Sequence, residues 1–277
     1  MPVLLCILVL IVLFALYVFL ILCEKPSKEQ TAPFQNLYCA HRGFYEKDQS
    51  VPENSLRAFE RAVENGYGVE LDVQLTKDGH VVVFHDDTVD RETEFNGRVD
   101  SFTLKELQSM SLFGTTGEKL GIPLFTDVMK VLDGKSPTIV ELKSTDNYPV
   151  LCEKTLAILR TCKGPYCVES FDYRIVRWFK KNAPDLMRGQ LTESYSGWHK
   201  SIPAFAAFGM SHLWTNVVTR PHFIAYGSMD QPLALRLARP FGAFTVYWTC
   251  EPQSDHETLK KRYDCIIFQY FHPDTHY

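Results

Sequence analysis

The fold of this chain is decided by the stretch VELDVQLTKDGHVVVFHD, residues 69–86. Its first half reads as a buried strand, except that two acids, Glu70 and Asp72, interrupt the apolar residues. Side chains two positions apart on a strand lie on the same face of the sheet. The two carboxylates should therefore point together to one side of this strand, while the apolar residues around them point to the other.

The second half of this stretch should be the return arm of a hairpin. Only five residues, with an Asp-Gly pair among them, separate the strand expected at 67–74 from the apolar run at 80–85. An Asp-Gly pair favours a tight hairpin turn, whereas parallel neighbours need a crossover of a dozen or more residues. We therefore expect 80–85 to pair antiparallel with 67–74 and to begin an insertion at about 75–120.

Strand and helix patterns alternate along the rest of the chain, which favours a parallel sheet. Strands are expected at 37–41, 67–74, 80–85, 137–142, 166–171, 187–192, 212–218, 243–249 and 263–268. Helices are expected at 52–66, 123–133, 148–161, 172–183, 228–239 and 252–261. Without the hairpin arm at 80–85, eight strands remain, and each leads into a helix or loop. The sequence therefore predicts an α/β fold, a TIM (β/α)8 barrel over 37–277, with a small insertion after its second strand.

The N-terminal segment differs from the rest of the chain. Residues 3–23 are 21 residues without a charge, and at about 1.5 Å per residue they can cross a bilayer core of about 30 Å. A cleaved signal peptide fits less well, because no basic segment precedes the run and no small-x-small site closes it. We expect a single-pass transmembrane anchor at 1–23 and a polar tether at 24–36. Lysines follow the span and none precedes it, which places the globular part on the cytoplasmic side.

The overall composition is that of an ordinary globular protein. The chain has 277 residues, of which 45% are hydrophobic and 22% charged, and its formal net charge is -4. This is enough material for a large core. A nucleic-acid-binding domain usually carries a basic face, so nucleic acid is not an expected partner.

Three acids in this chain are candidates for a metal site. Two bare carboxylates inside a barrel, Glu70 and Asp72, would repel each other and be poorly solvated. A divalent cation removes both problems, and oxygen ligands without cysteine suit a hard ion such as Mg²⁺ or Ca²⁺. Glu141, in VELK at 140–143, can supply a third oxygen ligand. The pattern alone leaves an alternative open, in which these are solvated acids on an edge strand or partners in salt bridges.

Two histidines and two cations are candidates for the chemistry. His41 ends the first strand, where the active sites of TIM barrels lie, although a core histidine would fit the same pattern. His85 returns along the hairpin toward the paired acids. Two histidines beside an anionic centre can act as general base and general acid. Arg42 and Lys143 can hold an anionic oxygen such as that of a phosphate.

Taken together, these segments resemble the glycerophosphodiester phosphodiesterase family of the phospholipase-C-like phosphodiesterase superfamily. The matching segments are HRG at 41–43, the run at 52–86, VELK at 140–143, SFD at 170–172, YWT at 247–249 and IIFQYFHP at 266–273. Each segment alone is common, but their order from about residue 38 to 273 is specific.

The resemblance implies a TIM barrel with a small insertion after the second strand, and it implies roles for individual residues. These are one divalent cation, Ca²⁺ or Mg²⁺, on the acids Glu70, Asp72 and Glu141; catalytic histidines at His41 and His85; and phosphate contacts from Arg42 and Lys143. Trp248 matches a family tryptophan near the pocket, and plain core packing is an equal alternative for it.

The sequence departs from the family pattern at three places. RETEFNGRV at 91–99 replaces a usual Arg-Thr-Thr-Gly run, Cys250 and Glu251 follow Trp248-Thr249 in place of the usual Val-Asn, and Phe268-Gln269 replaces a usual Thr-Asp. These changes leave the acids and histidines in place. They put substrate preference in doubt more than catalysis.

The expected function is metal-dependent cleavage of a glycerophosphodiester to glycerol 3-phosphate and an alcohol. In this family the nucleophile can be the glycerol 2-hydroxyl, which forms a cyclic phosphate that water then opens. The membrane anchor suggests an alternative with the same chemistry, a lysophospholipase D acting on membrane lysophospholipids. A binding barrel without turnover is a third possibility. An apolar groove in the segment at 111–125 would favour the lysolipid, and core packing there would favour the small diester.

Overall fold

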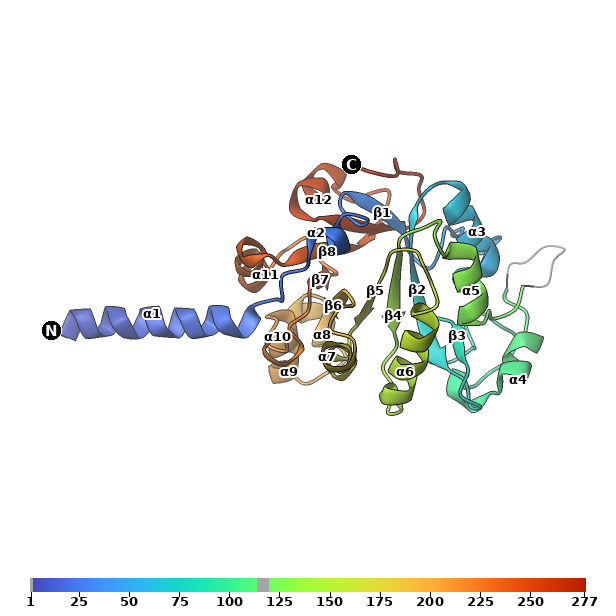
Figure 1. Cartoon of the computed structure of the whole chain (residues 1–277), viewed down its shortest axis with the longest axis horizontal. Helices are drawn as coiled ribbons and strands as arrows, with labels where there is room; N and C mark the ends of the chain where they lie inside the picture. Colours follow the sequence, from blue (N-terminus) through green and yellow to red (C-terminus); the bar gives the residue numbers. More distant parts are fainter. Residues whose placement is uncertain (1, 114–119) are drawn as a thin grey trace.

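Eight parallel strands close into a barrel in the computed structural model, which describes residues 2–113 and 120–277 (Figure 1). The barrel strands are β1 Leu37–Ala40, β2 Gly68–Leu75, β4 Thr138–Leu142, β5 Tyr166–Ser170, β6 Arg188–Thr192, β7 Phe223–Tyr226, β8 Phe244–Cys250 and β9 Cys265–Phe268. Each strand pairs in parallel with its neighbours, and β1 pairs with both β2 and β9, which closes the sheet. The predicted TIM barrel is confirmed.

The hairpin after β2 also forms as predicted. β3, Val81–Val83, runs antiparallel to β2, and Val73 lies opposite Val83. Gly79 in the turn has a φ of +77°, a left-handed conformation that glycine adopts readily. The insertion continues through a 3-10 turn, η1 Val99–Ser101, and a short helix, α4 Leu104–Ser109.

The insertion packs around a small core of its own. Its buried side chains are Val82, Phe84, Val89, Val99, Leu107, Met110, Leu112 and Ile122. The groove considered at 111–125 falls partly on residues 114–119, which lie outside the described residues. On either side of that gap, Leu112 and Ile122 are buried in this core.

Helices surround the barrel strands. They are α3 Leu56–Glu64, α5 Phe125–Leu132, α6 Tyr148–Leu159, α7 Tyr173–Asn182, α8 Tyr195–Trp198, α9 Ala204–Ser211, α10 Asn216–Thr219, α11 Leu233–Ala238 with the 3-10 turn η2 Arg239–Phe241, and α12 His256–Arg262. In α3, the Ser55 hydroxyl accepts a hydrogen bond from the Ala58 amide at the N-cap, and Phe59 and Ala62 face the core.

The barrel interior changes from apolar to polar along the strands. On β2, Val69, Leu71 and Val73 pack against the surrounding helices, so Glu70 and Asp72 point inward, as their spacing predicted. The end of the barrel where the strands begin is filled by an apolar cluster that includes Phe34, Leu37 and Phe223. The inward carboxylates are thereby placed toward the carboxyl ends of the strands.

The seventh barrel strand lies later in the chain than predicted. Residues 212–218, expected as this strand, form a turn and the first part of α10, and the strand is Phe223–Tyr226. The β-branched residues Val217 and Val218 suggested a strand, but their side chains are partly exposed on a helical turn. The true strand has only four residues, all buried. α8 and α9, which lie between β6 and β7, were not predicted.

The N-terminal helix α1, Pro2–Ile21, extends away from the barrel (Figure 1). It has 20 residues, a mean hydropathy of 3.4 in its most apolar window and almost no buried residues. Its length and composition suffice to cross a membrane, and a signal sequence has the same properties. A short helix, α2 Lys28–Thr31, follows before β1.

Candidate active site

A cavity of about 190 Å³ opens where the inward side chains of the barrel strands meet. The residues that line it are His41, Arg42, Glu70, His85, Glu141, Glu169, Phe171, Leu191, Trp248, Thr249 and Ile267. Six of the eight residues singled out in the sequence are among them. The other two lie next to them, because Asp72 pairs with Arg42 and Lys143 pairs with Glu141 and Asp72. The fold thus brings all eight together.

The three predicted metal-binding acids form one buried cluster. Glu70, Asp72 and Glu141 each offer a carboxylate oxygen within 4.8 Å of the other two. Burial raises the pKa of Glu70 well above its usual range, and the neighbouring carboxylates raise it further. Burial also raises the pKa of Glu141. Concentrated negative charge in a dry site is unfavourable without a cation.

Lys143 lies directly over this cluster. Its Nζ is 2.9 Å from Glu141 Oε1 and 3.2 Å from Asp72 Oδ1. Burial alone would raise the pKa of Asp72, but the positive charge of Lys143 and its other neighbours outweighs burial and lowers it. Burial alone would lower the pKa of Lys143, but the two carboxylates raise it above its usual value. Lys143 is therefore held as a cation at the cavity.

Arg42 is positioned by a sharp turn at the end of β1. Arg42 and Gly43 both have positive φ values, +52° and +80°. This turn lets the Arg42 amide donate to Glu70 Oε2 at 3.1 Å, while its guanidinium donates to Glu53 Oε1 at 2.6 Å. Asn54, next to Glu53, donates through its side-chain amide to Asp72 Oδ2 at 2.9 Å. The residues before α3 therefore contact the site as well as starting that helix.

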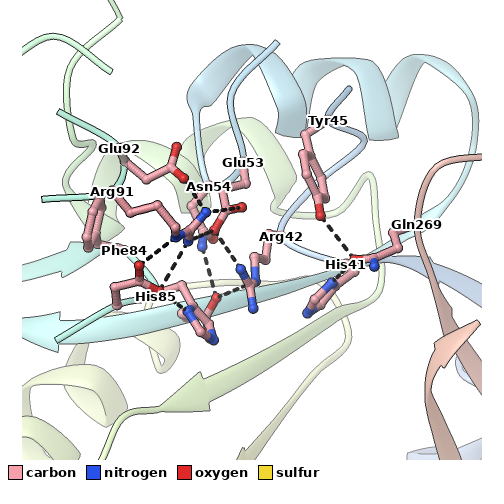
Figure 2. A network of polar contacts seen from close by, with 12 residues as sticks. His41, Arg42, Tyr45, Glu53, Asn54, Phe84, His85, Arg91, Glu92 and Gln269 are labelled. Carbon is pink, nitrogen blue, oxygen red and sulfur yellow. Dashed lines mark hydrogen bonds and ion pairs between the residues drawn. The ribbon is translucent and has the colours of Figure 1, made fainter. Parts of the chain in front are cut away.

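His41 is oriented by a chain of polar side chains at the end of β9 (Figure 2). Its Nδ1 lies 2.7 Å from Gln269 Oε1, which also accepts from the Tyr45 hydroxyl, and Gln269 Nε2 donates to Glu251 Oε1. Because the Gln269 oxygen accepts, Nδ1 of His41 is the donor and Nε2 carries the lone pair. Burial, and then the charge of Arg42, lower the pKa of His41 to about 3.

His85 is oriented by a carboxylate instead of an amide. Its Nδ1 lies 2.6 Å from Asp86 Oδ1, and Arg91 holds the other Asp86 oxygen at 2.6 Å. The hydrogen bond from His85 contributes most to lowering the pKa of Asp86. Arg91 also donates to Glu53, so the carboxylate of Glu53 lies between the guanidinium groups of Arg42 and Arg91 (Figure 2). Arg91 belongs to the segment 91–99 that departs from the family pattern.

An aromatic wall forms the other side of the cavity. The rings of Phe171 and Trp248 meet edge to face with centroids 5.5 Å apart. Trp248 therefore lines the pocket as well as packing against a neighbour. Its indole Nε1 is buried and has no hydrogen-bond partner among the described residues. A buried donor without a partner costs free energy, so this N–H is available to a bound molecule.

Sequence reasoning missed several side chains of the site, most notably Glu169. On neighbouring strands Asp72, Glu141 and Glu169 lie side by side in register, which places a fourth carboxylate next to the triad. Burial, and then the charge of Glu141, raise the pKa of Glu169 well above its usual range, and its Oε2 has no partner among the described residues. The inward alternation in YCVES could have identified it. The roles of Glu53, Asn54, Arg91 and Gln269 depend on contacts across the fold that no local pattern encodes.

The composition of this cluster fits a hard divalent cation. The donors are all carboxylate oxygens, and they are buried at the end of a cavity. Four carboxylates, from Glu70, Asp72, Glu141 and Glu169, lie beside two cations, Arg42 and Lys143. With every group ionised, the cluster keeps a net charge of two negative units, which one divalent cation would neutralise.

Comparisons with known proteins identify the family of this chain. The model of the glycerophosphoryl diester phosphodiesterase family matches residues 41–272. A glycerophosphodiester phosphodiesterase of Caldanaerobacter subterraneus subsp. tengcongensis is 36% identical over 237 residues, covering 82% of this chain and 90% of that protein. Human glycerophosphodiester phosphodiesterase 1 is 42% identical over 73 residues, 26% of this chain and 21% of that protein.

Solved structures share the fold. A phosphodiesterase of Oleispira antarctica, determined in complex with the product sn-glycerol-3-phosphate, superposes with a TM-score of 0.69 at 22% identity, covering 84% of this chain and 93% of that one. The glycerophosphodiester phosphodiesterase of Thermotoga maritima superposes with a TM-score of 0.60 at 24% identity, covering 84% and 93%. With the family model spanning most of the barrel, the chain belongs to the glycerophosphoryl diester phosphodiesterase family and is an enzyme of that family.

Proposed function

We propose that the protein hydrolyses glycerophosphodiesters to glycerol 3-phosphate and an alcohol with the help of one divalent cation, Mg²⁺ or Ca²⁺. The observation that carries the proposal is the content of a single cavity. The cavity and the residues that adjoin it combine a buried triad of acids, two cations and two histidines whose Nδ1 atoms are both occupied by partners. This is the set of groups that phosphodiester cleavage needs.

Glu70, Asp72 and Glu141 would hold the cation. When bound, it would polarise the phosphate and help to neutralise the charge that develops during cleavage. Lys143 and Arg42 bind the non-bridging phosphate oxygens, since both are held as cations at the edge of the triad. Trp248 Nε1, the unpartnered donor in the opposite wall, is a candidate contact for a substrate oxygen.

The partners of the two histidines suggest different roles for them. His85 Nδ1 lies against the carboxylate of Asp86, and we assign His85 the donation of a proton from Nε2 to the leaving alcohol oxygen. His41 Nδ1 donates to the neutral amide oxygen of Gln269, which leaves the lone pair on Nε2 to accept a proton from the attacking hydroxyl. That hydroxyl belongs to C2 of the glycerol or to water, and the alcohol leaves as its P–O bond breaks. Where the glycerol 2-hydroxyl attacks, water then opens the cyclic phosphate to give glycerol 3-phosphate.

The named relatives favour a small diester over a lysophospholipid. They are glycerophosphodiester phosphodiesterases, and the Oleispira antarctica enzyme was determined with glycerol 3-phosphate as its product. We propose further that residues 1–23 anchor the enzyme in a membrane and that the barrel, 37–277, follows the segment 24–36 on the cytoplasmic side. The length and hydropathy of α1 support a membrane anchor. Lys25 and Lys28, which follow α1, support a barrel on the cytoplasmic side.

The test uses the purified full chain in detergent, first stripped with a chelator and then supplied with Mg²⁺ or Ca²⁺. Glycerophosphocholine and lysophosphatidylcholine are offered separately, and both choline and glycerol 3-phosphate are measured. We expect metal-dependent release of choline and glycerol 3-phosphate from the small diester. Undiminished activity after chelation, or release of phosphocholine instead of choline, would contradict the proposal.

A matched pair of variants locates the metal requirement. Glu141→Gln removes one ligand charge from the triad and should lower activity by roughly 100-fold or more at limiting metal. Glu153→Gln makes the same change at an exposed position on α6 and should leave activity unchanged. Equal activity of the two variants would remove Glu141 from the proposed metal site.

A further inference from the structure

The end of α1 is attached to the barrel by side chains. Asn216 Nδ2 donates to the carbonyl of Ile21 at 2.8 Å, and Arg220 Nη1 donates to the carbonyls of Phe19 and Leu22 at 2.7 and 2.9 Å. Carbonyls in the last turn of a helix have no partner within the helix. Both donors come from the barrel, so α10 and the residue after it cap α1.

Packing and charge strengthen the same attachment. Ile21 is fully buried in the main core, and the Arg220 guanidinium lies over the Phe19 ring at 4.6 Å. The next residues are held too, because the Glu24 amide donates to the Pro221 carbonyl and the Glu24 carboxylate pairs with the buried Arg188. No free linker separates α1 from the barrel, so the direction of the helix fixes the orientation of the barrel.

Exposed apolar side chains gather around the place where α1 leaves the barrel. Among the described residues, ten large apolar side chains outside α1 are exposed, and six of them lie on α9, α10, α11 and η2. These six are Phe205, Phe208, Val217, Val218, Leu233 and Phe241. Phe205 is 78% exposed, Leu233 60% and Phe241 54%. Both α10 and α11 contact α1 directly.

The view of the whole chain in Figure 1 shows the helices that carry these apolar side chains on the same side as α1. α9, α10 and α11 form the side of the barrel from which α1 projects, and α4 of the insertion lies on the opposite side (Figure 1). Phe95 and Phe113, two more of the exposed apolar residues, belong to the segment between β3 and α5. They can serve as controls, because they are exposed apolar residues that lie away from the point where α1 leaves the barrel.

We propose that the surface formed by α9, α10, α11 and η2 lies against the same lipid bilayer that α1 enters. The inference rests on the proposed membrane anchor and adds to it a second, peripheral contact. A helix rigidly joined to a protein brings the protein surface around its exit to the membrane, where exposed Phe, Leu and Val side chains can enter the region between headgroups and acyl chains. The apolar composition of the six side chains matches this partner.

This contact would bring one edge of the active site close to the membrane. The segment 193–219 runs from the end of β6 to the cap of α1, and it carries Trp198. The Trp198 ring packs edge to face on Phe171, which lines the cavity, with centroids 5.5 Å apart. The segment therefore contacts a wall residue of the catalytic cavity near one end and α1 at the other.

The test compares labels at two exposed phenylalanines in the full chain. Phe205→Cys and Phe95→Cys are made in a background with Cys6→Ala, Cys23→Ala and Cys162→Ala, because the remaining cysteines are buried. Each protein is labelled with a polarity-sensitive fluorophore and reconstituted into vesicles of phosphatidylcholine and phosphatidylglycerol. Quenching is measured with a nitroxide lipid in the bilayer and with iodide in the water, and resistance to alkaline extraction checks that α1 is inserted.

We expect the label at 205 to be quenched by the nitroxide lipid roughly threefold or more strongly than the label at 95, and to be protected from iodide. Equal quenching of the two labels by both agents would overturn the proposed contact, because the anchor alone would then account for proximity to the membrane. Complete extraction of the protein by alkali would overturn both the anchor and the contact. Glycerophosphocholine hydrolysis by both labelled proteins verifies that the barrel is folded.

Discussion

Two arginines, the partly buried Arg42 at the catalytic cavity and the fully buried Arg188 at the junction with α1, meet opposite electrostatic surroundings. Arg42 lies among Glu53, Asp72 and Glu70, and their charges outweigh burial and raise its pKa. Arg188 is fully buried, and burial lowers its pKa even though Glu24, its carboxylate partner among the described residues, acts in the opposite direction. The other contacts of its guanidinium are backbone carbonyls and the ring of His222.

The difference separates two uses of the same side chain. At the cavity the acids outnumber the cations, so the site attracts positive charge and keeps Arg42 positively charged beside it. At the junction Nη1 and Nη2 of Arg188 donate to groups of the chain itself, and they connect Glu24, Pro184 and Arg220 from different parts of the sequence. The first arrangement favours binding and chemistry, and the second favours a fixed geometry.

The largest effect should come from the histidines of the catalytic region. His85→Ala should lower the rate on glycerophosphocholine by roughly 10²–10⁴-fold, the range for loss of a general acid or base. A p-nitrophenyl diester of glycerol phosphate has a leaving group that needs no proton, so the same variant should lose far less on that substrate. His41→Ala should lose activity on both. His80→Ala, at an exposed position on the same hairpin, is the control.

Steady-state rates on the two substrates check this assignment. An equal loss on both substrates for His85→Ala would mean that His85 does not protonate the leaving group. A near wild-type rate for His85→Ala on glycerophosphocholine would remove it from the mechanism.

The same substitution at the two arginines tests the comparison directly. Arg188→Met removes a fully buried guanidinium and leaves the Pro184 and Arg220 carbonyls without its hydrogen bonds, while the half-exposed Glu24 can turn to solvent. It should lower the free energy of unfolding by about 2–3 kcal/mol. Arg42→Met should change unfolding much less, because Arg91 and Lys143 still hold Glu53 and Asp72, but it should lower kcat/KM by roughly 100-fold. Urea unfolding and kinetics on both variants provide the two readouts. Similar losses of stability in Arg188→Met and Arg42→Met would contradict the view that Arg188 stabilises the fold and Arg42 serves the catalytic cavity.

The junction should also make stability depend on pH. Burial, and then the charge of Arg188, lower the pKa of His222 from 6.5 to about 4. The unfolded chain therefore binds a proton at this residue below pH 6.5 that the folded chain does not take up until about pH 4. The stabilisation is fully present above pH 6.5 and is lost as the pH falls toward 4.

His222→Gln removes this titration while keeping an acceptor for the Arg188 amide, which lies 3.2 Å from His222 Nδ1. We expect the stability lost between pH 7 and pH 4.5 to be about 2 kcal/mol smaller in the variant. Urea unfolding across this range gives the comparison, and parallel curves for the two proteins would contradict the expectation.

The smallest effect is expected at Glu169, in the catalytic cavity. Its raised pKa means that the folded chain holds a proton that the unfolded chain releases above about pH 4.5. Without metal, the stabilisation is fully present below that pH and is lost as the pH rises through the folded-state pKa. Glu169→Gln should therefore be more stable than the parent chain at pH 8 in chelator, by about 1 kcal/mol.

Thermal unfolding with and without metal checks this effect, with Glu153→Gln as the exposed control. A metal-free Glu169→Gln variant that is less stable than the parent would mean that the carboxylate is well paired in the folded chain.

Much of the fold was predictable because the deciding signals are local. Alternation on β2 established which side chains point inward, and the Asp-Gly turn separated the hairpin arm from the barrel strands. β7 was placed too early because propensity cannot distinguish a short buried strand from a partly exposed helical turn with the same residue types. Only pairing with β6 and β8 identifies Phe223–Tyr226 as a strand.

The barrel, the inward acids on β2 and β4, and the candidate histidines with their neighbouring cations could all be predicted from the order of residues alone. These follow from strand periodicity and from the order of motifs along the chain. The tertiary structure decided which partners orient the histidines, that Glu169 joins the acids, and how α1 is held on the barrel. Those contacts join residues far apart in sequence, such as His41 with Gln269 and Ile21 with Asn216. Their geometry exists only when the closed barrel brings distant strands and loops together.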